Sequence, residues 1–411
     1  MSSFMIDNVR SQESAQIAVP SSSATAVEGL EQLQRLQAEH PIWNCRLLRA
    51  CRAGLLTRED FRHIFSQYFR YSKNFTRYLA ALMMNCDSDY YRSRLSENLW
   101  EEGGGAEPDQ RHAELFRRFL REALEIDIQT IEYQSFANDF FHQYLDFCRN
   151  APPLEGSAFL SLGTEGAIAR LYGDFCEGLL KAGVPEEQLS FFRIHMECDD
   201  EHAITLAELM CSYADQPGWF AQCRAAMNRA LDIRQQFLDD ALDFALNARL
   251  KGLLDHVRQE DPRLPEGSEA KDFVYSGREP GADVSGLYSN QVERLNIDFT
   301  VRRVGFEADV FDVRVVNIPP HRNNELHRHS HESLLTVTRG QGKVRVGDHL
   351  IDVAAGDTVF VPRWVMHQTQ NTGDEPMELF AVTDYGLTRR AFLGDNLRTT
   401  RMTPSSDADA R

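Results

Sequence analysis

The sequence contains no cysteine after Cys223, and none of its eight cysteines forms a Cys-x-x-Cys pair. This pattern argues against a small disulfide scaffold and a paired-cysteine zinc site, so we expect reduced thiols. The chain also lacks any run of the roughly 18 consecutive apolar residues that a membrane helix requires. Its first residues lack the basic-then-apolar order of a signal peptide. We therefore expect a cytoplasmic protein without a membrane partner.

Basic residues are too few to balance the acidic ones. There are 44 Lys and Arg against 62 Asp and Glu, and the formal net charge is -18. Such a balance disfavours nucleic acid and anionic membranes, so neither is expected as a partner. The 411 residues exceed the usual length of one domain, and the hydrophobic fraction of 42% is that of a globular protein. We predict two domains.

The spacing of apolar residues divides the chain into a helical part and a strand part. From residue 28 to 250, apolar side chains recur every three or four positions, which predicts an all-α helical bundle. Residues 251–290 are rich in Pro, Gly, Ser and charge, as in an interdomain linker. Short runs with a period of two then predict an all-β barrel or sandwich over residues 291–396. We expect a flexible leader at residues 1–27 and a flexible tail at residues 397–411.

The segment FFRIHMECDDEHAITLAELM carries the most informative polar pattern of the helical part. His195, Asp199 and His202 fall at i, i+4 and i+7, so they project from one face of a helix. Two imidazoles and a carboxylate in this arrangement suit iron or manganese. The alternative is an exposed acidic face with two incidental histidines.

Three further residues extend this set. Glu165 lies in an otherwise apolar segment, where burial of a charge is costly unless it is paired or binds a metal. The alternative for Glu165 is a helix surface. Glu102 precedes a Gly-rich break, with Glu101 as its competitor, and His112 opens the next helix. Three carboxylates and three imidazoles fit a dinuclear site better than a single ion: Glu102, His112, Glu165, His195, Asp199 and His202.

These residues resemble the signature of the haem-oxygenase-like diiron oxidases and oxygenases: a Glu, a His, a second Glu and a final His-x-x-x-Asp-x-x-His helix. The resemblance covers roughly residues 28–250. It implies that the six residues bind two irons, and that O2 is activated with electrons from an external reductant. Some N-oxygenating members add a carboxylate from the first core helix, but here no Asp or Glu lies between Asp60 and Asp87. We therefore expect the second iron to be labile.

The strand part carries a second histidine pattern. His327 and His329 are two residues apart on a predicted strand, and a facing strand can supply His367. With Gly356, Pro362 and Asn371, these residues resemble the two motifs of the cupin superfamily over about residues 313–385.

The cupin resemblance implies a three-histidine site for one iron or another divalent metal. Ser333 aligns with the family's usual Glu ligand, so no carboxylate is expected there. We expect His331 to lie on the opposite face from His327 and His329. The alternative is a metal-free or merely stabilising cupin.

The order of the two domains resembles that of the enzyme family that forms the N-nitrosourea of streptozotocin. It implies a non-haem iron oxygenase of natural-product biosynthesis. The diiron site would oxygenate an amine or guanidine nitrogen of an amino-acid-derived small molecule, and the cupin iron would oxidise or rearrange the product. The sequence shows no dinucleotide or Walker pattern, so we expect a separate electron donor.

Two alternatives stay open. One is a diiron oxidase that cleaves or desaturates its substrate, with the cupin as a binding or sensing domain. The other is a metal-poor thiaminase-like or binding protein that uses a cysteine such as Cys198. For any of the three we expect a homodimer, paired through a helix at about residues 227–247.

Overall fold

The structure is a computed structural model that divides into two compact units, residues 1–245 and 246–411, and each unit is described here by itself. Side chains 197–201, 257, 284 and 285 are outside the description, so the side chains of Cys198 and Asp199 are not placed. Most of the predicted leader, half of the predicted linker and all of the predicted tail are also outside it. The structure describes residues 23–258, 267, 269, 273–275, 284–306 and 308–391.

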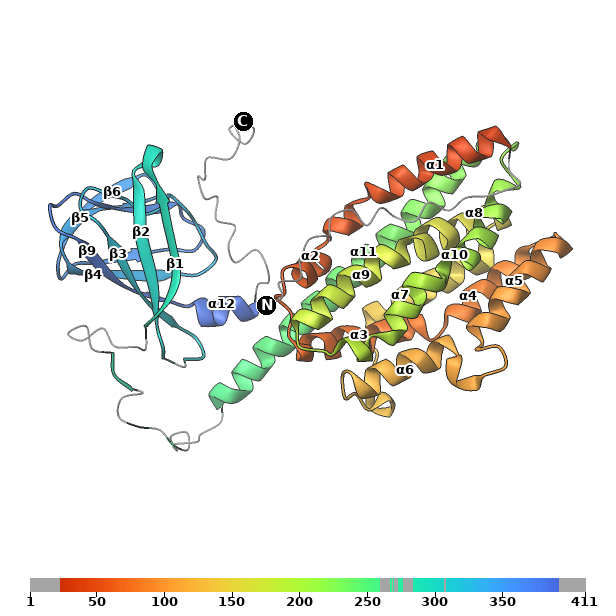
Figure 1. The fold of residues 1–411 in the computed structure, drawn as a ribbon, viewed down its shortest axis with the longest axis horizontal. Helices are drawn as coiled ribbons and strands as arrows, with labels where there is room; N and C mark the ends of the chain where they lie inside the picture. The colour runs from red at the N-terminus through yellow and green to blue at the C-terminus, as the bar shows by residue number, and fades with distance from the viewer. Residues whose placement is uncertain are drawn as a thin grey trace, which may run out of the picture. The chain divides into compact units, whose positions relative to one another are not determined.

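The first unit is a bundle of helices, as the periodicity predicts (Figure 1). Helix α3 begins at an expected signal, because the Thr57 side chain and Asp60 form a capping box at its start. Aromatic side chains such as Phe65, Tyr68 and Phe116 fill the core and are at most 1% exposed. The elements are α1 (Ala24–Ala38), η1 (Pro41–Asn44), α2 (Arg46–Arg52), α3 (Arg58–Ser72), α4 (Phe75–Asn85), α5 (Asp89–Glu102), η2 (Pro108–Gln110), α6 (His112–Glu122), η3 (Ile128–Thr130), α7 (Ser135–Asn150), α8 (Pro153–Leu160), η4 (Ser161–Glu165), α9 (Gly166–Lys181), η5 (Glu186–Gln188), α10 (Ser190–Cys211) and α11 (Trp219–Arg258).

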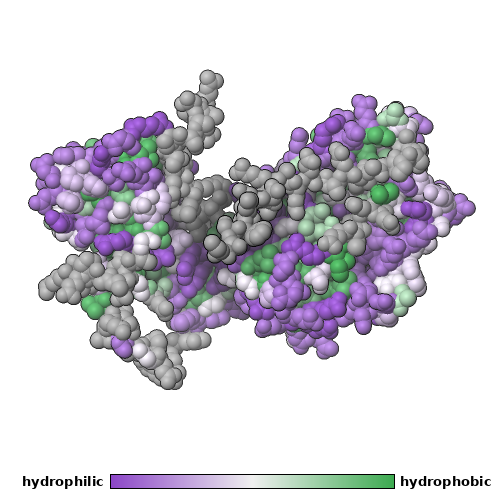
Figure 2. All heavy atoms as spheres, viewed as in Figure 1, coloured by the Kyte–Doolittle hydropathy of each residue, from purple (hydrophilic) through white to green (hydrophobic). Residues whose placement is uncertain are grey.

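Helix α11 extends beyond residue 250, where the sequence predicts the helical domain to end. Its apolar side chains, including Met227, Leu231 and Leu238, are buried. Among the described residues, no helix has both the length and the apolar character needed to cross a membrane. In Figure 2, hydrophilic residues cover most of the visible described surface, as expected for a strongly charged chain.

The second unit contains two antiparallel sheets, with strand orders β1-β2-β3-β9-β4-β7 and β6-β5-β8. Each run with a period of two that the sequence shows is a strand, and Gly347-Asp348 joins β5 to β6 as a two-residue turn, where Val346 pairs with His349. The elements are β1 (Val284–Val292), η7 (Glu293–Leu295), β2 (Ile297–Val304), β3 (Asp312–Ile318), β4 (Ser333–Arg339), β5 (Gln341–Val346), β6 (His349–Ala354), β7 (Thr358–Val361), β8 (His367–Asn371), β9 (Met377–Thr383) and α12 (Tyr385–Ala391).

The core of the second unit is built from both sheets. Ile297 and Phe299 of β2 and Leu379 of β9 pack in one cluster with Val344 of β5 and Val353 of β6. An all-α bundle followed by an all-β barrel-like unit is thus confirmed.

Candidate metal sites

A glycine-rich turn between α5 and α6 brings Glu102 and His112 together. Glu102 ends α5 and His112 begins α6, and they are 8% and 9% exposed. In the turn, Gly104 has φ +85°, and a Cβ there would lie 2.6 Å from the carbonyl oxygen of Glu107 and 2.7 Å from the backbone nitrogen of Arg111. A glycine is therefore required for the chain to reverse so tightly.

Glu165 ends the π-helical turn η4 between α8 and α9. Such turns interrupt α-helices frequently at functional sites. The side-chain amide of Gln37 donates a 2.6 Å hydrogen bond to the carbonyl oxygen of Leu162 and so helps to hold the turn. Glu165 is 6% exposed, and its Oε1 atom is buried without a hydrogen-bond partner among the described residues. An oxygen left this way costs about 1–3 kcal/mol, which a bound cation would offset.

His195 and His202 extend from α10 toward the same place. Nδ1 of His195 lies 2.6 Å from the carbonyl oxygen of Phe191, and because a carbonyl only accepts, Nδ1 carries the proton and Nε2 presents a lone pair. Nε2 of His202 donates to Oε2 of Glu101 at 2.7 Å. The other nitrogen of His202, Nδ1, lies 3.4 Å from Oε1 of Glu102 and has no hydrogen-bond partner among the described residues. Asp199 lies on α10 between them, but its side chain is outside the described residues, so its predicted role is not examined.

The distances within this cluster match those between ligands of one ion. Nδ1 of His112 lies 3.0 Å from Oε2 of Glu102 and 2.9 Å from Nε2 of His195. Metal–ligand bonds of about 2.1 Å at right angles place ligand atoms about 3.0 Å apart. Oε2 of Glu102 is also buried without a hydrogen-bond partner in the described part of the chain. The donor atoms and their unmet contacts therefore fit a metal ion, which we expect to be iron.

The charges of the cluster are coupled. Burial raises the pKa of the Glu102 carboxyl, but the charge of His112 and the nearby imidazole of His202 lower it by more, to well below its usual range. Burial lowers the pKa of His202, yet Glu102 and Glu165 outweigh it and raise the value to about 10. Burial, and then the charge of Glu102, raises the pKa of Glu165. Burial and His112 lower the pKa of His195 to about 4. Without metal, a protonated His202 thus faces an ionised Glu102.

Two polar residues hold the histidines from outside the cluster. The hydroxyl of Ser72, at the end of α3, lies 2.9 Å from Nε2 of His112. Glu101 is exposed and accepts the proton of His202, so it supports a candidate ligand and leaves the interior position to Glu102. The sequence alone does not reveal either role, because both partners lie on other helices.

Arg234 of α11 is a third residue that sequence reasoning missed. It is 0% exposed and donates hydrogen bonds to the hydroxyls of Tyr71 at 2.8 Å and Tyr144 at 3.2 Å. Its positive charge opposes the rise in the pKa of Glu165. A buried arginine on an otherwise apolar helix face is the one signal that would have pointed to it.

Aromatic rings cover part of the cluster. Phe75 stacks on His112 with 5.6 Å between ring centroids, and Phe191 packs against His195 at 4.3 Å. Such a shell lowers the local dielectric constant and strengthens the attraction between ligands and a cation.

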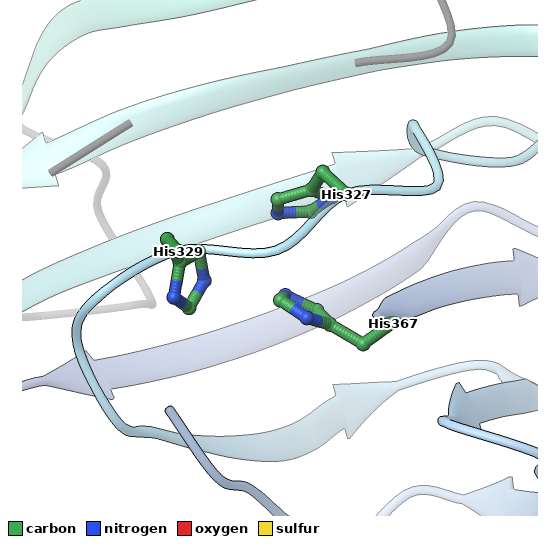
Figure 3. Close-up of side chains that lie close together, drawn as sticks. All are labelled: His327, His329 and His367. Atoms are coloured by element: carbon green, nitrogen blue, oxygen red, sulfur yellow. The ribbon is translucent and has the colours of Figure 1, made fainter. Parts of the chain in front are cut away.

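The cupin-like unit brings together the three predicted histidines, and their rings face one another (Figure 3). His327 and His367 form an antiparallel bridge, and the ring of His329 is 4.6 Å from that of His367. Because each Nδ1 donates to a carbonyl, each Nε2 presents a lone pair, as second-shell contacts do in metal sites. The three Nδ1 contacts are His327 to Glu325 at 2.8 Å, His329 to His331 at 2.9 Å and His367 to Val365 at 2.9 Å.

Two of these imidazoles, those of His329 and His367, are neutral without metal. Burial and the charge of His327 lower the pKa of His367 to about 3, and burial also lowers the pKa of His329. A neutral imidazole binds a divalent metal without first losing a proton.

The expectation that His331 lies on the opposite face is wrong. Glu325, His327, His329 and His331 all line one cavity of about 330 Å³, because an even spacing in an extended segment keeps side chains on one side. The ring of His331 stacks on that of His329 with 3.5 Å between centroids. Ser333 is buried and lines the same cavity at the position of the usual Glu ligand.

Comparisons with known proteins agree with the division of the chain into a helical part and a cupin-like part. The family model described as iron-containing redox enzyme matches residues 62–235, and the cupin domain model matches residues 314–383. The chain thus combines a haem-oxygenase-like iron redox enzyme domain with a C-terminal cupin domain.

Two curated relatives are each similar to less than half of the chain. A protein named 4-aminobenzoate synthase from Chlamydia pneumoniae is 26% identical over 160 residues, which is 38% of this chain and 70% of that protein. One of the same name from Nitrosomonas europaea is 26% identical over 199 residues, or 45% of this chain and 79% of that protein. A cupin 2 conserved barrel domain protein from Rhodopseudomonas palustris is similar in structure, with a TM-score of 0.25 and 22% identity over 29% of this chain and 79% of that one.

Proposed function

We propose that the protein is a non-haem iron, O2-dependent oxygenase that acts on an amine or guanidine nitrogen of an amino-acid-derived substrate. The observation that carries the iron site is the set of buried atoms without hydrogen bonds: Oε2 of Glu102, Oε1 of Glu165 and Nδ1 of His202. Three such atoms in one buried place are expensive unless a cation completes their contacts. The match to iron-containing redox enzymes supports iron as that cation.

In the helical domain, Glu102, His112, Glu165, His195, Asp199 and His202 would hold two irons. Iron supplies O2 activation, and an external donor would supply the electrons. The protein's own part is to orient the ligands and exclude water. Ser72 and Glu101 hold the imidazoles of His112 and His202, and Phe75 and Phe191 cover the cluster.

In the cupin domain, His327, His329 and His367 would hold one iron or another divalent metal. The proposed role is further oxidation or rearrangement of the N-oxygenated product, in natural-product biosynthesis. The order of the two domains supports this role, because it resembles that of N-nitrosourea-forming enzymes.

The test is incubation of Fe(II)-loaded protein with a reductant, 18O2 and a panel of amino acids, followed by mass spectrometry. We expect one product to carry 18O on nitrogen. Glu102→Gln should abolish it, whereas Glu101→Gln, one residue away and exposed, should lower the rate by at most about tenfold. Fe(II)-loaded protein that consumes no O2 with any amino acid contradicts the proposal.

A second candidate is a diiron oxidase that cleaves or desaturates its substrate. The relatives named 4-aminobenzoate synthase support it, because their matches cover only 38% and 45% of this chain and so do not require both domains. His367→Ala separates the two: the oxidase makes its final product unchanged, and the proposed oxygenase accumulates an N-oxygenated intermediate. A thiaminase-like or binding protein would instead hold less than about one iron per chain after anaerobic loading.

A further inference from the structure

The cupin cavity contains two arginines that no metal site requires. Arg303 of β2 and Arg314 of β3 are paired across the sheet, and both line the cavity. They share one carboxylate: Nε of Arg303 lies 2.9 Å from Asp312, and Nε of Arg314 lies 2.6 Å from it. Two guanidinium groups against one carboxylate leave an excess of positive charge at this end of the cavity.

These contacts to Asp312 engage the inner nitrogens of the two guanidinium groups. Both closest contacts use Nε, and the contact of Arg303 lacks hydrogen-bond geometry. The terminal Nη pair of a guanidinium is the fork that matches a carboxylate in a bidentate contact. The ring of Tyr385 packs against Arg314 with 5.1 Å between its centroid and Cζ, which holds the arginine in place.

His331 connects this end of the cavity to the three histidines. It is 1% exposed, and its Nδ1 atom has no hydrogen-bond partner in the described part of the chain. On one side its ring stacks on His329, and on the other it contacts the ring of Tyr385 at 5.6 Å. A buried polar atom without a partner in the wall of a cavity is a contact that a ligand would complete.

The far end of the cavity has the opposite charge. Glu325 is 3% exposed and accepts hydrogen bonds from Tyr288 and Asn290 of β1. The segment that contains it runs parallel to β2, because Ile297 bridges Asn323. Glu325 is therefore level with about residue 299, and Arg303 lies four residues further along β2, or roughly 13 Å. Apolar side chains, including Val301, Val316 and Leu379, line the walls.

We propose that the cupin cavity binds a small carboxylate ligand, with its carboxylate on Arg303 and Arg314 and its body beside the three histidines. The volume of about 330 Å³ suits a ligand of amino-acid size. Glu325 would repel a carboxylate from the far end and so fixes the orientation. The inference rests on the proposed function for its choice of an amino-acid carboxylate, whereas the anion site is testable without turnover.

Calorimetric titration of the full-length protein, both chelator-treated and zinc-loaded, provides the test. The probes are acid and amide pairs: isovalerate and isovaleramide, benzoate and benzamide, L-arginine and L-argininamide. We expect at least one acid to bind about tenfold or more tightly than its amide, with and without zinc. Absence of an acid preference in all three pairs overturns the proposal.

Substitutions assign the preference to the arginines. Arg303→Gln and Arg314→Gln should each weaken the preferred acid about tenfold and leave its amide unchanged, whereas Arg345→Gln on the exposed side of β5 should change neither. If both variants bind the acid as the wild type does, and only removal of zinc weakens it, the metal is the carboxylate's partner and the proposal is wrong.

The Asp312→Asn variant tests whether loss of folding explains the weaker acid binding of the arginine variants. It removes the carboxylate that competes for the two arginines, so we expect several-fold tighter binding of the acid, which a misfolded protein cannot show. Weaker acid binding by a folded Asp312→Asn protein contradicts the proposal. If isovalerate or benzoate requires the arginines but L-arginine does not bind, the anion site stands and the amino-acid substrate of the proposed function fails.

Discussion

The helical and cupin sites orient their imidazoles in two different ways. In the cupin, each histidine donates Nδ1–H to a carbonyl two residues away along the chain. In the helical domain, His195 uses its own helix, but His112 relies on Ser72 of α3 and His202 relies on Glu101 of α5. The first arrangement is local, and the second is assembled from several helices and carries charge. The cupin site should therefore be the more preorganised of the two.

The largest expected effect is a loss of metal from the cupin site alone. His367→Ala removes one of three ligands, so cupin affinity for Fe(II) or Zn(II) should fall by more than about 100-fold, while the helical site keeps its metal. Metal analysis by mass spectrometry after dialysis measures both. Equal loss from the two sites would show that they are not independent.

The buried carboxylate of Glu165 in the helical site is expected to lower the stability of the metal-free protein. Glu165→Met replaces a buried carboxylate that lacks a hydrogen bond at Oε1, so the free energy of unfolding of the chelated protein should rise by about 1–3 kcal/mol. Since the pKa of Glu165 is raised, its folded state disfavours the ionised form, and the gain should grow as pH rises above the usual value of 4.5.

Chemical denaturation at pH 5 and pH 8 measures this gain. The exposed Glu122→Met on α6 is the control and should change stability by less than about 0.5 kcal/mol. A Glu165→Met protein that is less stable than the wild type at pH 8 would mean that Arg234 depends on this carboxylate.

A smaller effect is expected at Ser72, which contacts the candidate metal ligand His112 from another helix. Ser72→Ala removes the hydroxyl beside Nε2 of His112, so metal affinity should fall about tenfold at the helical site and stay unchanged at the cupin. Ser66→Ala is matched to it, because the hydroxyl of Ser66 bonds to the carbonyl of His63 on the same helix. Equal effects of the two substitutions would assign Ser72 to helix stability alone.

The smallest effect is a difference in proton release. His202, with a pKa of about 10, must lose a proton to bind metal at pH 7, whereas His367, with a pKa of about 3, is already neutral. The helical site should thus release about one proton more per metal than the cupin. Calorimetry in two buffers, with His367→Ala and Glu102→Gln to isolate each site, measures it. Equal proton release from the two sites would contradict the expected difference in protonation between His202 and His367.

The cupin site could be predicted almost completely from the sequence, and its one error is instructive. The strands, the turn at Gly347-Asp348 and the meeting of His327, His329 and His367 follow from a period of two. The same rule, applied correctly, places His331 beside His329. The arginine pair of the cavity escaped notice because Arg303 and Arg314 are neighbours only across two strands.

In the helical site, sequence spacing identifies candidates but not their supports. His195 and His202 share a helix face by periodicity, and an apolar context singles out Glu165. The choice between Glu101 and Glu102 depends on the helix end and on Gly104, and the contacts of Ser72 and Arg234 depend on helix packing.

The sequence by itself determined the two-part architecture and the residue types able to bind metal, because periodicity and ligand spacing are local properties of a chain. The excess of acidic over basic residues is equally visible in the sequence. It bears on which binding partners are expected and not on iron binding. Only the tertiary structure decided which carboxylate faces inward, which nitrogen of His195 and of the three cupin ligands carries the proton, and which buried atoms have no hydrogen bond. Those depend on contacts between segments far apart in the chain, which no local pattern encodes.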